Sequence, residues 1–529
     1  MSDERLSSTE INSEESDLKT LSVQEQLKGK HILITGVTGF VGKVLLTMIA
    51  AHSPSIRRIS VLIRSNRSGD AKARFETEVI PSEPFKATKK LVDERSGEGE
   101  FTKWVDSVIS PVTGDITEDQ LGLSDQDYHH LTREDPLELI IHCAGNVNFD
   151  PPLNEALEVN TLGAQHKVAL ARDAGCPLVH MSTCFVVGER SGPVTESSEI
   201  VGYTPNRRPF DPQREVREAV AMIERWRLDA VDQVNSERFY QEACEALEEK
   251  GMNSKSEDTL ARELEKIRSK WLKNALKEAG MSRAKSWGWT NTYTYTKSLG
   301  EQLTVMAAQE AGVALSIVRP AIVESAQRFP FVGWNEGINT CAPIVYLYWK
   351  GQRFSPSDPD NILDVVPVDW VCQGTLLAAA ELLEGNGKLV YQLSTGGENP
   401  LRMRRAIELT NLAWRAQYDR EFKPLKRHLM RNLDTITVSA SQYKRFGAPA
   451  IEKATRGIGG LLKSLPKPAQ RLMKPVERGV QMINKSAQLT DTIFTLFAPF
   501  ILENNPQFVS DHVIEAAARL SEEERLVLG

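Results

Sequence analysis

Several features that would place a protein in a membrane, in an oxidising compartment or on nucleic acid are missing from this chain of 529 residues. It holds only six cysteines, none of them spaced as C-x-x-C, so the composition indicates no metal site and suits a reducing compartment. Its longest apolar runs, such as Ile493 to Leu502, fall short of the about 20 residues that span a bilayer. The net charge of −7 argues against nucleic acid as a partner. Residues 1–27 carry Ser and Glu rather than a basic, apolar leader, so we expect a disordered acidic tail and a cytoplasmic location.

What is present is an alternation of short, β-branched apolar runs with helical patterns. The run HILITGV precedes a helical pattern at 40–52, and a longer helical pattern at 153–175 ends at Gly175. Predicted strands lie at 31–37, 58–63, 108–116, 137–144, 177–184 and 314–323. This alternation predicts an α/β fold with a doubly wound parallel sheet, in which a ligand binds at the carboxyl ends of the strands.

Two other stretches differ from this pattern in their charge. Residues 206–290 hold 17 Lys/Arg and 16 Asp/Glu and space their apolar residues at helix-compatible intervals, which predicts a helical insertion. Its nearly balanced charge fits a solvated helical face, and a lid over the active site is the alternative. Residues 421–490 hold 14 Lys/Arg against 4 Asp/Glu, and a local net charge of +10 attracts phosphates, anionic lipid or an acidic protein.

These shifts in composition divide the chain into five parts. They are the acidic tail 1–27, a Rossmann domain 28–205, the charged helical insertion 206–290, the rest of the Rossmann domain with a substrate-binding part 291–400, and a basic, mainly helical C-terminal domain 401–529.

The stretch ITGVTGFVGK follows the first predicted strand and opens a predicted helix. Gly36 permits a tight turn, Gly39 lets the backbone approach a pyrophosphate, and Gly42 lets the helix pack on the strand. The helix N-terminus offers unpaired N–H groups to the phosphates. We interpret the stretch as a dinucleotide cradle, with a purely structural turn as the alternative. The other predicted cofactor contacts in it are Thr35, Thr38, Phe40 and Val41.

The end of the second predicted strand, VLIRSNR, indicates which dinucleotide binds. An NAD site usually has a carboxylate there, whereas this chain has Arg64 and Arg67. A guanidinium suits a 2′-phosphate, so NADP(H) is favoured, and exposed surface arginines are the alternative. Asp115 ends the third strand before Ile116, where it is either a contact for the adenine amino group or a turn residue.

The stretch NTYTYTKSLGE carries the predicted reaction centre. Tyr293 and Lys297 are four residues apart and share a helix face, so a phenol can give its proton to a carbonyl oxygen as a hydride arrives. We expect the ammonium of Lys297 to lower the pKa of that phenol and to hold the nicotinamide ribose. At the end of the fifth strand, alternation lets one of Ser182 and Thr183 face the cofactor, and we prefer Thr183 as the hydroxyl that binds the substrate carbonyl.

These segments together resemble a known family. In order, TGVTGFVG, IIHCAGNVNFD, MSTCFVVG and YTYTK resemble the extended short-chain dehydrogenase/reductase superfamily. NTYTYTKSLGE, SIVRPAIVESA, a Pro and GW at 330–334, and DVVPVDWV look like the alcohol-forming fatty acyl-CoA reductases of the male-sterility type. The match covers most of 28–400, and TIFTLFAPFILENN resembles the family's C-terminal domain more loosely. The insertion departs from the usual short spacing, resembles bacterial members, and leaves the shape of the substrate channel open.

The resemblance implies NADPH-dependent reduction of a long-chain acyl thioester, with release of CoA, to an aldehyde and then a fatty alcohol. Thr183, Tyr293 and Lys297 match the catalytic set. Cys143, Ala144 and Gly145 fall where the family lines the cofactor, Asn160 at the asparagine that organises the active-site helix, and Pro320 beside the carboxamide. For Asn160 a plain helix surface, and for Pro320 a strand-ending proline, are the alternatives. The +10 segment is a candidate contact for CoA or an acyl carrier protein, for anionic membrane, or for solvent alone.

Three other functions share parts of this pattern. A nucleotide-sugar epimerase or dehydratase has the cradle and the Tyr/Lys pair but is expected to carry a carboxylate where Arg64 stands. A non-catalytic NADP-sensing protein tends to lose Tyr293 and Lys297, which are present. A reductase domain of a carrier-protein synthase follows carrier or adenylation segments, so we expect a free-standing enzyme. The final product, the chain length and the oligomeric state stay open.

Overall fold

The computed structural model describes residues 20–528 apart from 198–200, 253–255, 338–339, 422 and 432–433, and the predicted disorder of residues 1–19 lies outside this range. Residues 20–27, which follow directly, are part of the folded structure. Leu21, Val23 and Leu27 are buried, and α1 (Val23–Leu27) packs on α14 (Val368–Glu384). The predicted disordered tail is therefore wrong for residues 20–27, because their apolar side chains complete the core.

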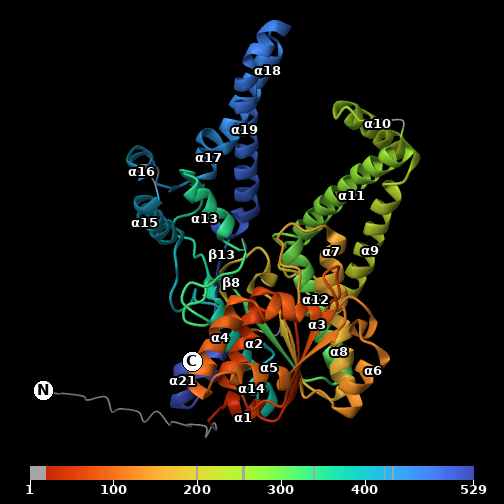
Figure 1. Ribbon diagram of the computed structural model, residues 1–529, viewed down its shortest axis with the longest axis vertical. Helices are drawn as coiled ribbons and strands as arrows, with labels where there is room; N and C mark the ends of the chain where they lie inside the picture. The colour runs from red at the N-terminus through yellow and green to blue at the C-terminus, as the bar shows by residue number, and fades with distance from the viewer. Residues whose placement is uncertain are drawn as a thin grey trace, which may run out of the picture.

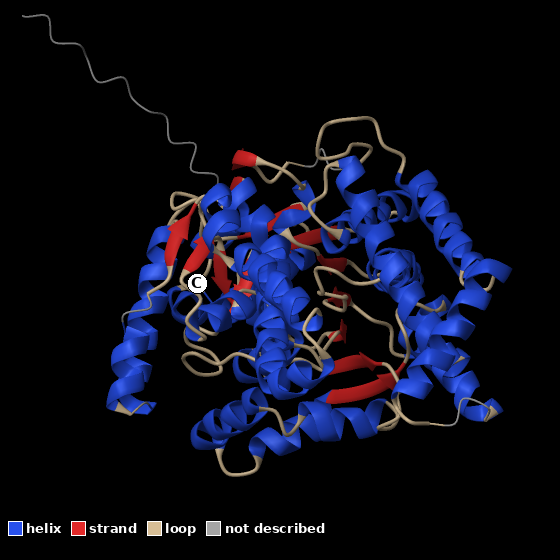
Figure 2. Cartoon of the chain, turned by 90° about the horizontal axis from the view of Figure 1, so that it is seen from above, coloured by secondary structure: helices blue, strands red, loops and turns tan. Residues whose placement is uncertain are grey.

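A seven-stranded parallel sheet forms the centre of the molecule, in the order β11-β7-β5-β4-β1-β2-β3. The strands are β1 (His31–Thr35), β2 (Arg58–Ile63), β3 (Ile109–Thr113), β4 (Leu139–His142), β5 (Leu178–Met181), β7 (Leu315–Pro320) and β11 (Val390–Leu393). Helices pack around it on both sides (Figure 2). The predicted doubly wound sheet is confirmed. Its strand order reverses between β1 and β4, which places a ligand crevice at their carboxyl ends.

The helices divide between the two faces of the sheet. On one side α2 (Phe40–His52) packs between α4 (Glu83–Ser96) and α14, and on the other α8 (Gly163–Ala174) packs on α12 (Thr292–Ala311). The remaining helices of this unit are α3 (Ala71–Arg74), α5 (Glu100–Val108), α6 (Asp125–His129) and α7 (Leu153–Leu157). The single helix predicted over 153–175 is divided by a π-helical turn, Glu158–Leu162, between α7 and α8, and it ends at Gly175 as expected.

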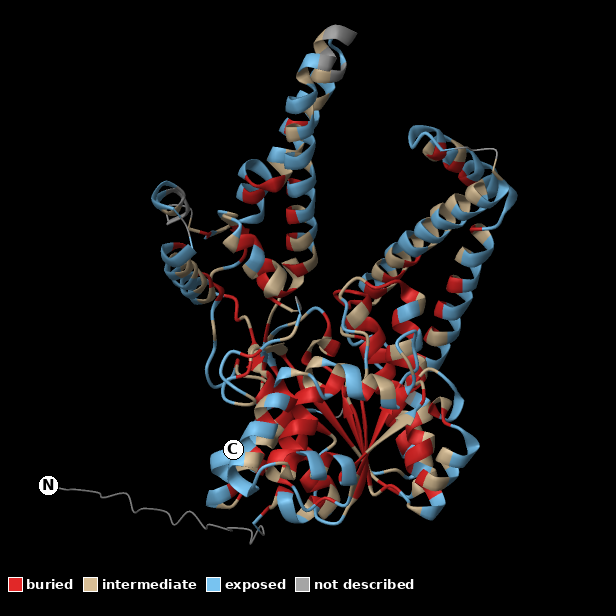
Figure 3. Cartoon of the chain, in the orientation of Figure 1, coloured by how far each residue is buried: buried red, intermediate tan, exposed pale blue. Residues whose placement is uncertain are grey.

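The charged insertion forms the predicted helices, α9 (Pro212–Asp229), α10 (Gln233–Glu249) and α11 (Glu257–Trp287), which rise from the sheet unit as an arm (Figure 1). Its outer surface is exposed, and its base is buried against α12 (Figure 3). There the Tyr295 hydroxyl donates to Glu215, which also accepts from Arg283 at 2.7 Å. The insertion thereby braces the helix that carries Tyr293 and Lys297.

The C-terminal region forms a second arm (Figure 1). Its helices are α15 (Met403–Glu421), α16 (Pro424–Arg431), α17 (Ala440–Phe446), α18 (Ala448–Lys463) and α19 (Lys467–Ala498), beside α13 (Ala342–Trp349). One short parallel pair, β12 (Ile436–Val438) with β9 (Phe354–Pro356), joins the arm to the segment after α13. A second pair, β10 (Val365–Pro367) with β8 (Ile322–Glu324), connects the segments that follow β7 and precede α14.

The last part of the chain returns to the Rossmann unit. β13 (Asn505–Phe508) pairs with β6 (Ser191–Val194), and α20 (Asp511–Ala518) and α21 (Glu522–Leu528) pack on α14. A separate C-terminal domain over 401–529 therefore does not describe residues 505–528, whose buried apolar side chains belong to the sheet's own core.

Candidate active site

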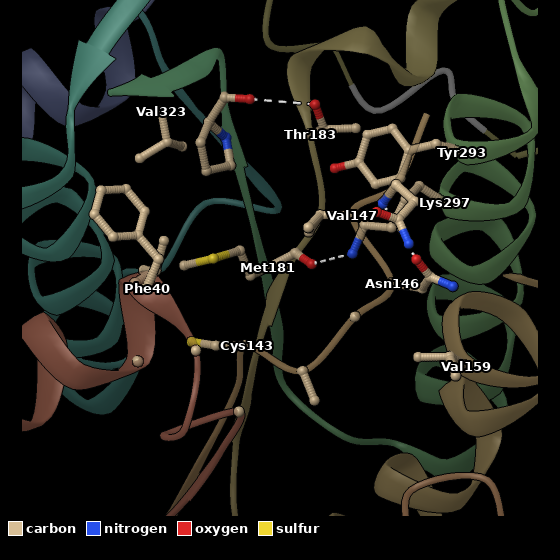
Figure 4. Close-up of a pocket in the computed structure, with 18 of the residues that line it drawn as sticks. Phe40, Cys143, Asn146, Val147, Val159, Met181, Thr183, Tyr293, Lys297 and Val323 are labelled. Atoms are coloured by element: carbon tan, nitrogen blue, oxygen red, sulfur yellow. Dashed lines mark hydrogen bonds between the residues drawn. The ribbon is translucent and has the colours of Figure 1, made fainter. Parts of the chain in front are cut away.

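A cavity of about 720 Å³ lies at the carboxyl ends of the central strands. It collects most of the residues that the sequence singled out, from segments far apart in the chain (Figure 4). The predicted residues that line it are Thr35, Gly36, Thr38, Gly39, Phe40, Val41, Gly42, Arg64, Asp115, Ile116, Cys143, Ala144, Gly145, Thr183, Tyr293, Lys297 and Pro320. Arg67 and Asn160 do not line it.

The cradle is shaped by close backbone contacts. Gly36 has a φ of +80°, and a Cβ there would lie 2.7 Å from the backbone nitrogen of Ala144. A Cβ on Gly42 would lie 2.2 Å from the carbonyl oxygen of Gly36. Gly39 is the N-cap of α2 and makes no side-chain cap, so the first N–H groups of the helix stay open for a phosphate. This geometry fits a dinucleotide pyrophosphate.

Side chains fix the neighbouring ends of β1 and β4. The hydroxyl of Thr35 accepts from the backbone N–H of Ala144 at 3.2 Å and contacts Nδ1 of His142 at 3.0 Å. Cys143 and Gly145 are thereby held along the same wall, where the family resemblance places them.

The far end of the cradle carries arginines. Nη1 of Arg64 lies 3.7 Å from Oδ2 of Asp115, and the Arg64 side chain stays largely exposed. Oδ1 of Asp115 accepts from the N–H of Thr117 at 3.0 Å, so this residue also makes the turn that was its alternative role. Arg67 is exposed and does not line the cavity. Arg74, which the sequence argument missed, lines the cavity and donates to the Arg64 carbonyl at 2.6 Å.

The reaction centre is built where β5 ends and α12 begins. Asn291 caps α12 by accepting from the N–H of Thr294 at 2.8 Å, which sets Tyr293 in the first turn. Lys297 follows one turn later, and its Nζ donates to the Met181 carbonyl at 2.7 Å (Figure 4).

The hydroxyl of Thr183 is the better placed of the two candidates. It donates to the Pro320 carbonyl at 3.3 Å, and its hydrogen bonding with Tyr293 acts on the pKa of that phenol. The hydroxyl of Ser182 is buried and has no hydrogen-bond partner among the described residues. Thr183 and Tyr293 therefore both line the part of the cavity where the carbonyl oxygen of a substrate would bind.

Burial shifts the pKa values of the two titratable groups of the reaction centre, Tyr293 and Lys297, and so sets their protonation. Burial raises the pKa of Tyr293 to about 12, although the hydrogen bond with Thr183 lowers it in part. Burial lowers the pKa of Lys297 to about 8, while Glu301 raises it. The expected lowering of the Tyr293 pKa by Lys297 is therefore not found here, because burial outweighs other effects and the ammonium is directed at Met181. At neutral pH the phenol keeps its proton and Lys297 is mainly charged.

Asn160 acts on the site without touching the cavity. Its Oδ1 accepts from the N–H of Asn146 at 2.8 Å, and its Nδ2 donates to the carbonyl of the same residue at 3.0 Å. Nδ2 also donates to Thr296 at 3.2 Å. The π-helical turn thereby ties the loop after β4 to α12, in keeping with an organising role rather than a plain helix surface.

Opposite the cradle, the cavity is closed by aromatic rings that the sequence argument missed. The ring centroid of Phe149 lies 6.0 Å from that of Tyr293 and 5.4 Å from those of Phe497 and Phe500. Phe185 meets Phe500 edge-on at 5.0 Å. Ile322, Val323, Cys341 and Leu363 complete this apolar end. Phe497 and Phe500 recur three residues apart at the base of the C-terminal arm, and this spacing in TIFTLFAPF was the available signal.

The described part of the insertion takes no part in the cavity wall. Among the described residues, none between 206 and 290 lines the cavity. The structure therefore gives it the role of a brace with a solvated outer face and does not bear out a lid.

The fold and the site define a nicotinamide-dependent oxidoreductase of the extended short-chain dehydrogenase/reductase type. An NAD-binding family model described as "Male sterility protein" matches residues 34–375. The chain belongs to this family, that of the fatty acyl-CoA reductases.

Individual relatives agree with this placement, and a solved structure shares the fold. The chain is 31% identical over 386 residues to "Probable fatty acyl-CoA reductase 5" of Arabidopsis thaliana, covering 72% of this chain and 69% of that one. It is 28% identical over 399 residues to "Alcohol-forming fatty acyl-CoA reductase" of Simmondsia chinensis, covering 74% and 71%. The crystal structure of the terminal R domain of the myxalamid PKS-NRPS pathway superposes with a TM-score of 0.53 at 18% identity over 93% of this chain and 85% of that one, which shows a shared fold. Among the described residues, no helix combines the length and apolar character that crossing a bilayer requires.

Proposed function

We propose that the protein reduces long-chain fatty acyl-CoA to fatty alcohol through an aldehyde, with NADPH as reductant and release of CoA. The observation that carries this proposal is one continuous cavity. It joins a dinucleotide cradle, a Tyr/Lys pair with a hydroxyl partner, and an aromatic end suited to an acyl chain. The name of the alcohol-forming relative supports the four-electron reaction.

The choice of NADPH rests on the basic far end of the cradle. Arg64 lines it, Arg74 holds the backbone of Arg64 in place, and Asp115 is already engaged by Thr117 and Arg64. A free carboxylate for ribose hydroxyls is thus replaced by a guanidinium, which suits a 2′-phosphate.

Each bound NADPH would supply one hydride. The first would go to the acyl carbonyl carbon, with CoA leaving as a thiolate that takes up a proton from solvent, and a second NADPH, bound after exchange of the oxidised cofactor, would supply the hydride to the aldehyde carbon. Thr183 turns its hydroxyl from the Pro320 carbonyl to the substrate carbonyl oxygen, donates a hydrogen bond to it and stabilises the developing charge. Tyr293, protonated at neutral pH, gives its proton to the alkoxide in the aldehyde reduction. Lys297, held by Met181, orients the nicotinamide ribose and keeps a positive charge near the phenol. Phe149, Phe497 and Phe500 exclude water from the acyl chain.

The test is the stoichiometry of the reaction with palmitoyl-CoA. We expect two NADPH oxidised per CoA released and hexadecanol as the lipid product, with NADH much less effective. One NADPH per CoA with accumulation of hexadecanal would instead establish the aldehyde-forming alternative. If an acylated carrier protein were reduced and acyl-CoA were not, the CoA assignment would fail. No NADPH oxidation with any acyl thioester would overturn the proposal as a whole.

A further inference from the structure

The α18–α19 hairpin (residues 448–498) extends beyond the body of the molecule (Figures 1 and 3). The two helices are antiparallel, because contacts pair early residues of one with late residues of the other. Thr455 donates to Oδ1 of Asn484 at 2.9 Å, and Nε2 of Gln488 donates to Glu452 at 2.9 Å. These four side chains define the face that each helix turns to the other.

Large apolar side chains are exposed along both helices of the hairpin. Leu461 is 70% exposed and Leu472 is 82% exposed. The stripe consists of Ile451, Ile458 and Leu461 on α18, and of Leu472, Val476 and Ile483 on α19. Intervals of three, four and seven residues place each set on one side of its helix.

The two stripes lie on the same side of the hairpin. An α-helix has 3.6 residues per turn, so each stripe lies about a quarter turn around its helix from the residues that contact the partner helix. Viewed along each helix from its N-terminus to its C-terminus, the direction of this quarter turn is the same in α18 and in α19. Since the helices run in opposite directions, these equal rotations point to one side of the pair. One side of the hairpin is therefore mainly apolar, and none of the described residues covers it, although Met482 and Leu489 are exposed on the other side of α19.

Basic side chains occupy the opposite face. Lys453 on α18 and Lys474, Arg478 and Lys485 on α19 are exposed and lie on the other side of the inter-helix contact. Among the described residues, none of these four makes an ion pair. On the insertion arm, by contrast, charges are paired, as in Lys250 with Glu263 at 2.8 Å. Among the described residues, the hairpin thus combines a mainly apolar side with exposed cations that make no ion pair.

We propose that the α18–α19 hairpin docks the enzyme on a bilayer that contains anionic lipid. Its apolar face enters the interface, and its basic side chains reach the anionic headgroups along their flexible stems. Charge complementarity selects this occupant, because an anionic bilayer compensates the +10 charge of residues 421–490 as well as covering the apolar side, whereas a second copy of the chain would leave these charges uncompensated. Phe497, in the last turn of α19, lines the cavity, so the docked hairpin is directly connected to the apolar end of the site.

The test is flotation of the purified full-length protein with phosphatidylcholine vesicles that contain or lack phosphatidylglycerol. We expect binding only to the anionic vesicles, weakened by salt. The combined substitutions Lys474→Glu, Arg478→Glu and Lys485→Glu should reduce partitioning at least roughly 100-fold, since each cation near the surface contributes about fivefold. The combined substitutions Ile458→Ser, Leu472→Ser and Ile483→Ser should also release the protein. Leu228→Ser with Lys270→Glu, on the exposed surface of the insertion arm, is the matched control and should bind as wild type.

Vesicle binding requires neither cofactor nor turnover, so it separates this proposal from the proposed reaction. Wild-type protein that stays unbound, or equal loss in the insertion control, would overturn the proposal. A higher KM for soluble acyl-CoA in the charge variant, with unchanged vesicle binding, would assign the basic face to CoA instead. A smaller sedimenting mass of the apolar variant, with unchanged vesicle binding, would assign the apolar face to a second copy. Matching circular dichroism of all variants excludes misfolding as the cause.

Discussion

The two ends of the cavity are built in different ways. The cofactor end consists of backbone turns and short polar contacts, and its cradle is one continuous stretch, Thr35–Gly42. The aromatic end consists of Phe149 and Phe185 from one part of the chain and of Phe497 and Phe500 from a distant part near the C-terminus, and the two pairs meet only through ring packing. The family match at 34–375 contains the whole cofactor end but stops before Phe497.

The difference between the two ends indicates that the chemistry depends on the cofactor end and that substrate selectivity depends on the aromatic end. A phosphate cradle needs a backbone conformation, which only particular residue types at fixed spacing allow, so it tolerates little change. An acyl chain needs apolar volume, which many side chains can provide. We therefore expect substitutions at the cofactor end to remove activity, and those at the aromatic end to change which substrate is used.

The largest effect is expected at Tyr293, between the two ends. Tyr293→Phe keeps the ring that contacts Phe149 but removes the proton that the phenol donates. We expect kcat for aldehyde reduction to fall by at least about 100-fold, with little change in KM, which steady-state assays with hexadecanal measure. Tyr295→Phe is the control, because that hydroxyl donates to Glu215 and should affect stability alone. Full activity of Tyr293→Phe would refute the proton-donor role.

Gly36→Ala tests how rigidly the cofactor end is built. The positive φ alone costs about 1–2 kcal/mol for a residue with a Cβ, and the contact with Ala144 adds to this. We expect NADPH affinity, followed by fluorescence titration, to fall more than about tenfold. Gly175→Ala has a similar φ of +71° but no atom within 4 Å of the added Cβ, so it should cost stability and leave affinity unchanged. Equal affinity losses in both variants would mean that strain, rather than the cradle, is responsible.

Phe500→Ala tests the aromatic end. Removing a buried ring costs about 3–5 kcal/mol of stability and opens space beside Phe149 and Phe185. We expect the preference in kcat/KM to move by roughly tenfold toward longer acyl chains, while NADPH affinity is kept. Phe75→Ala, a buried ring of the sheet core, should lose comparable stability without altering chain preference. The same change of preference in both variants would show that the aromatic end does not set selectivity.

The contrast between a cofactor end built from local sequence and an aromatic end built from distant segments also explains which features the sequence could predict. β1, β2 and α2 lie at or within one or two residues of their expected bounds, because periodicity and glycine spacing act locally. The π-helical turn was not foreseeable, since it follows from Asn160 and Thr161 bonding to residues more than a hundred positions away in α12. Arg74 and the four phenylalanines were missed for the same reason. Their place in the cavity depends on how distant elements pack.

The smallest effect concerns the choice of cofactor, where two neighbouring arginines can be compared directly. Arg64 lines the cavity beside Asp115, whereas Arg67 is exposed outside it. A charge-assisted hydrogen bond to a 2′-phosphate contributes about 1.5–3 kcal/mol, and solvent screening reduces this at an exposed side chain. We expect Arg64→Ala to lower the ratio of kcat/KM for NADPH over NADH by about fivefold, and Arg67→Ala to leave it unchanged. If Arg67→Ala lowered the ratio as much, the 2′-phosphate would be bound by the exposed loop rather than the cavity wall. If neither variant changed it, Arg74 would be the remaining guanidinium at this end of the cradle, and the Arg74→Ala variant would decide the matter.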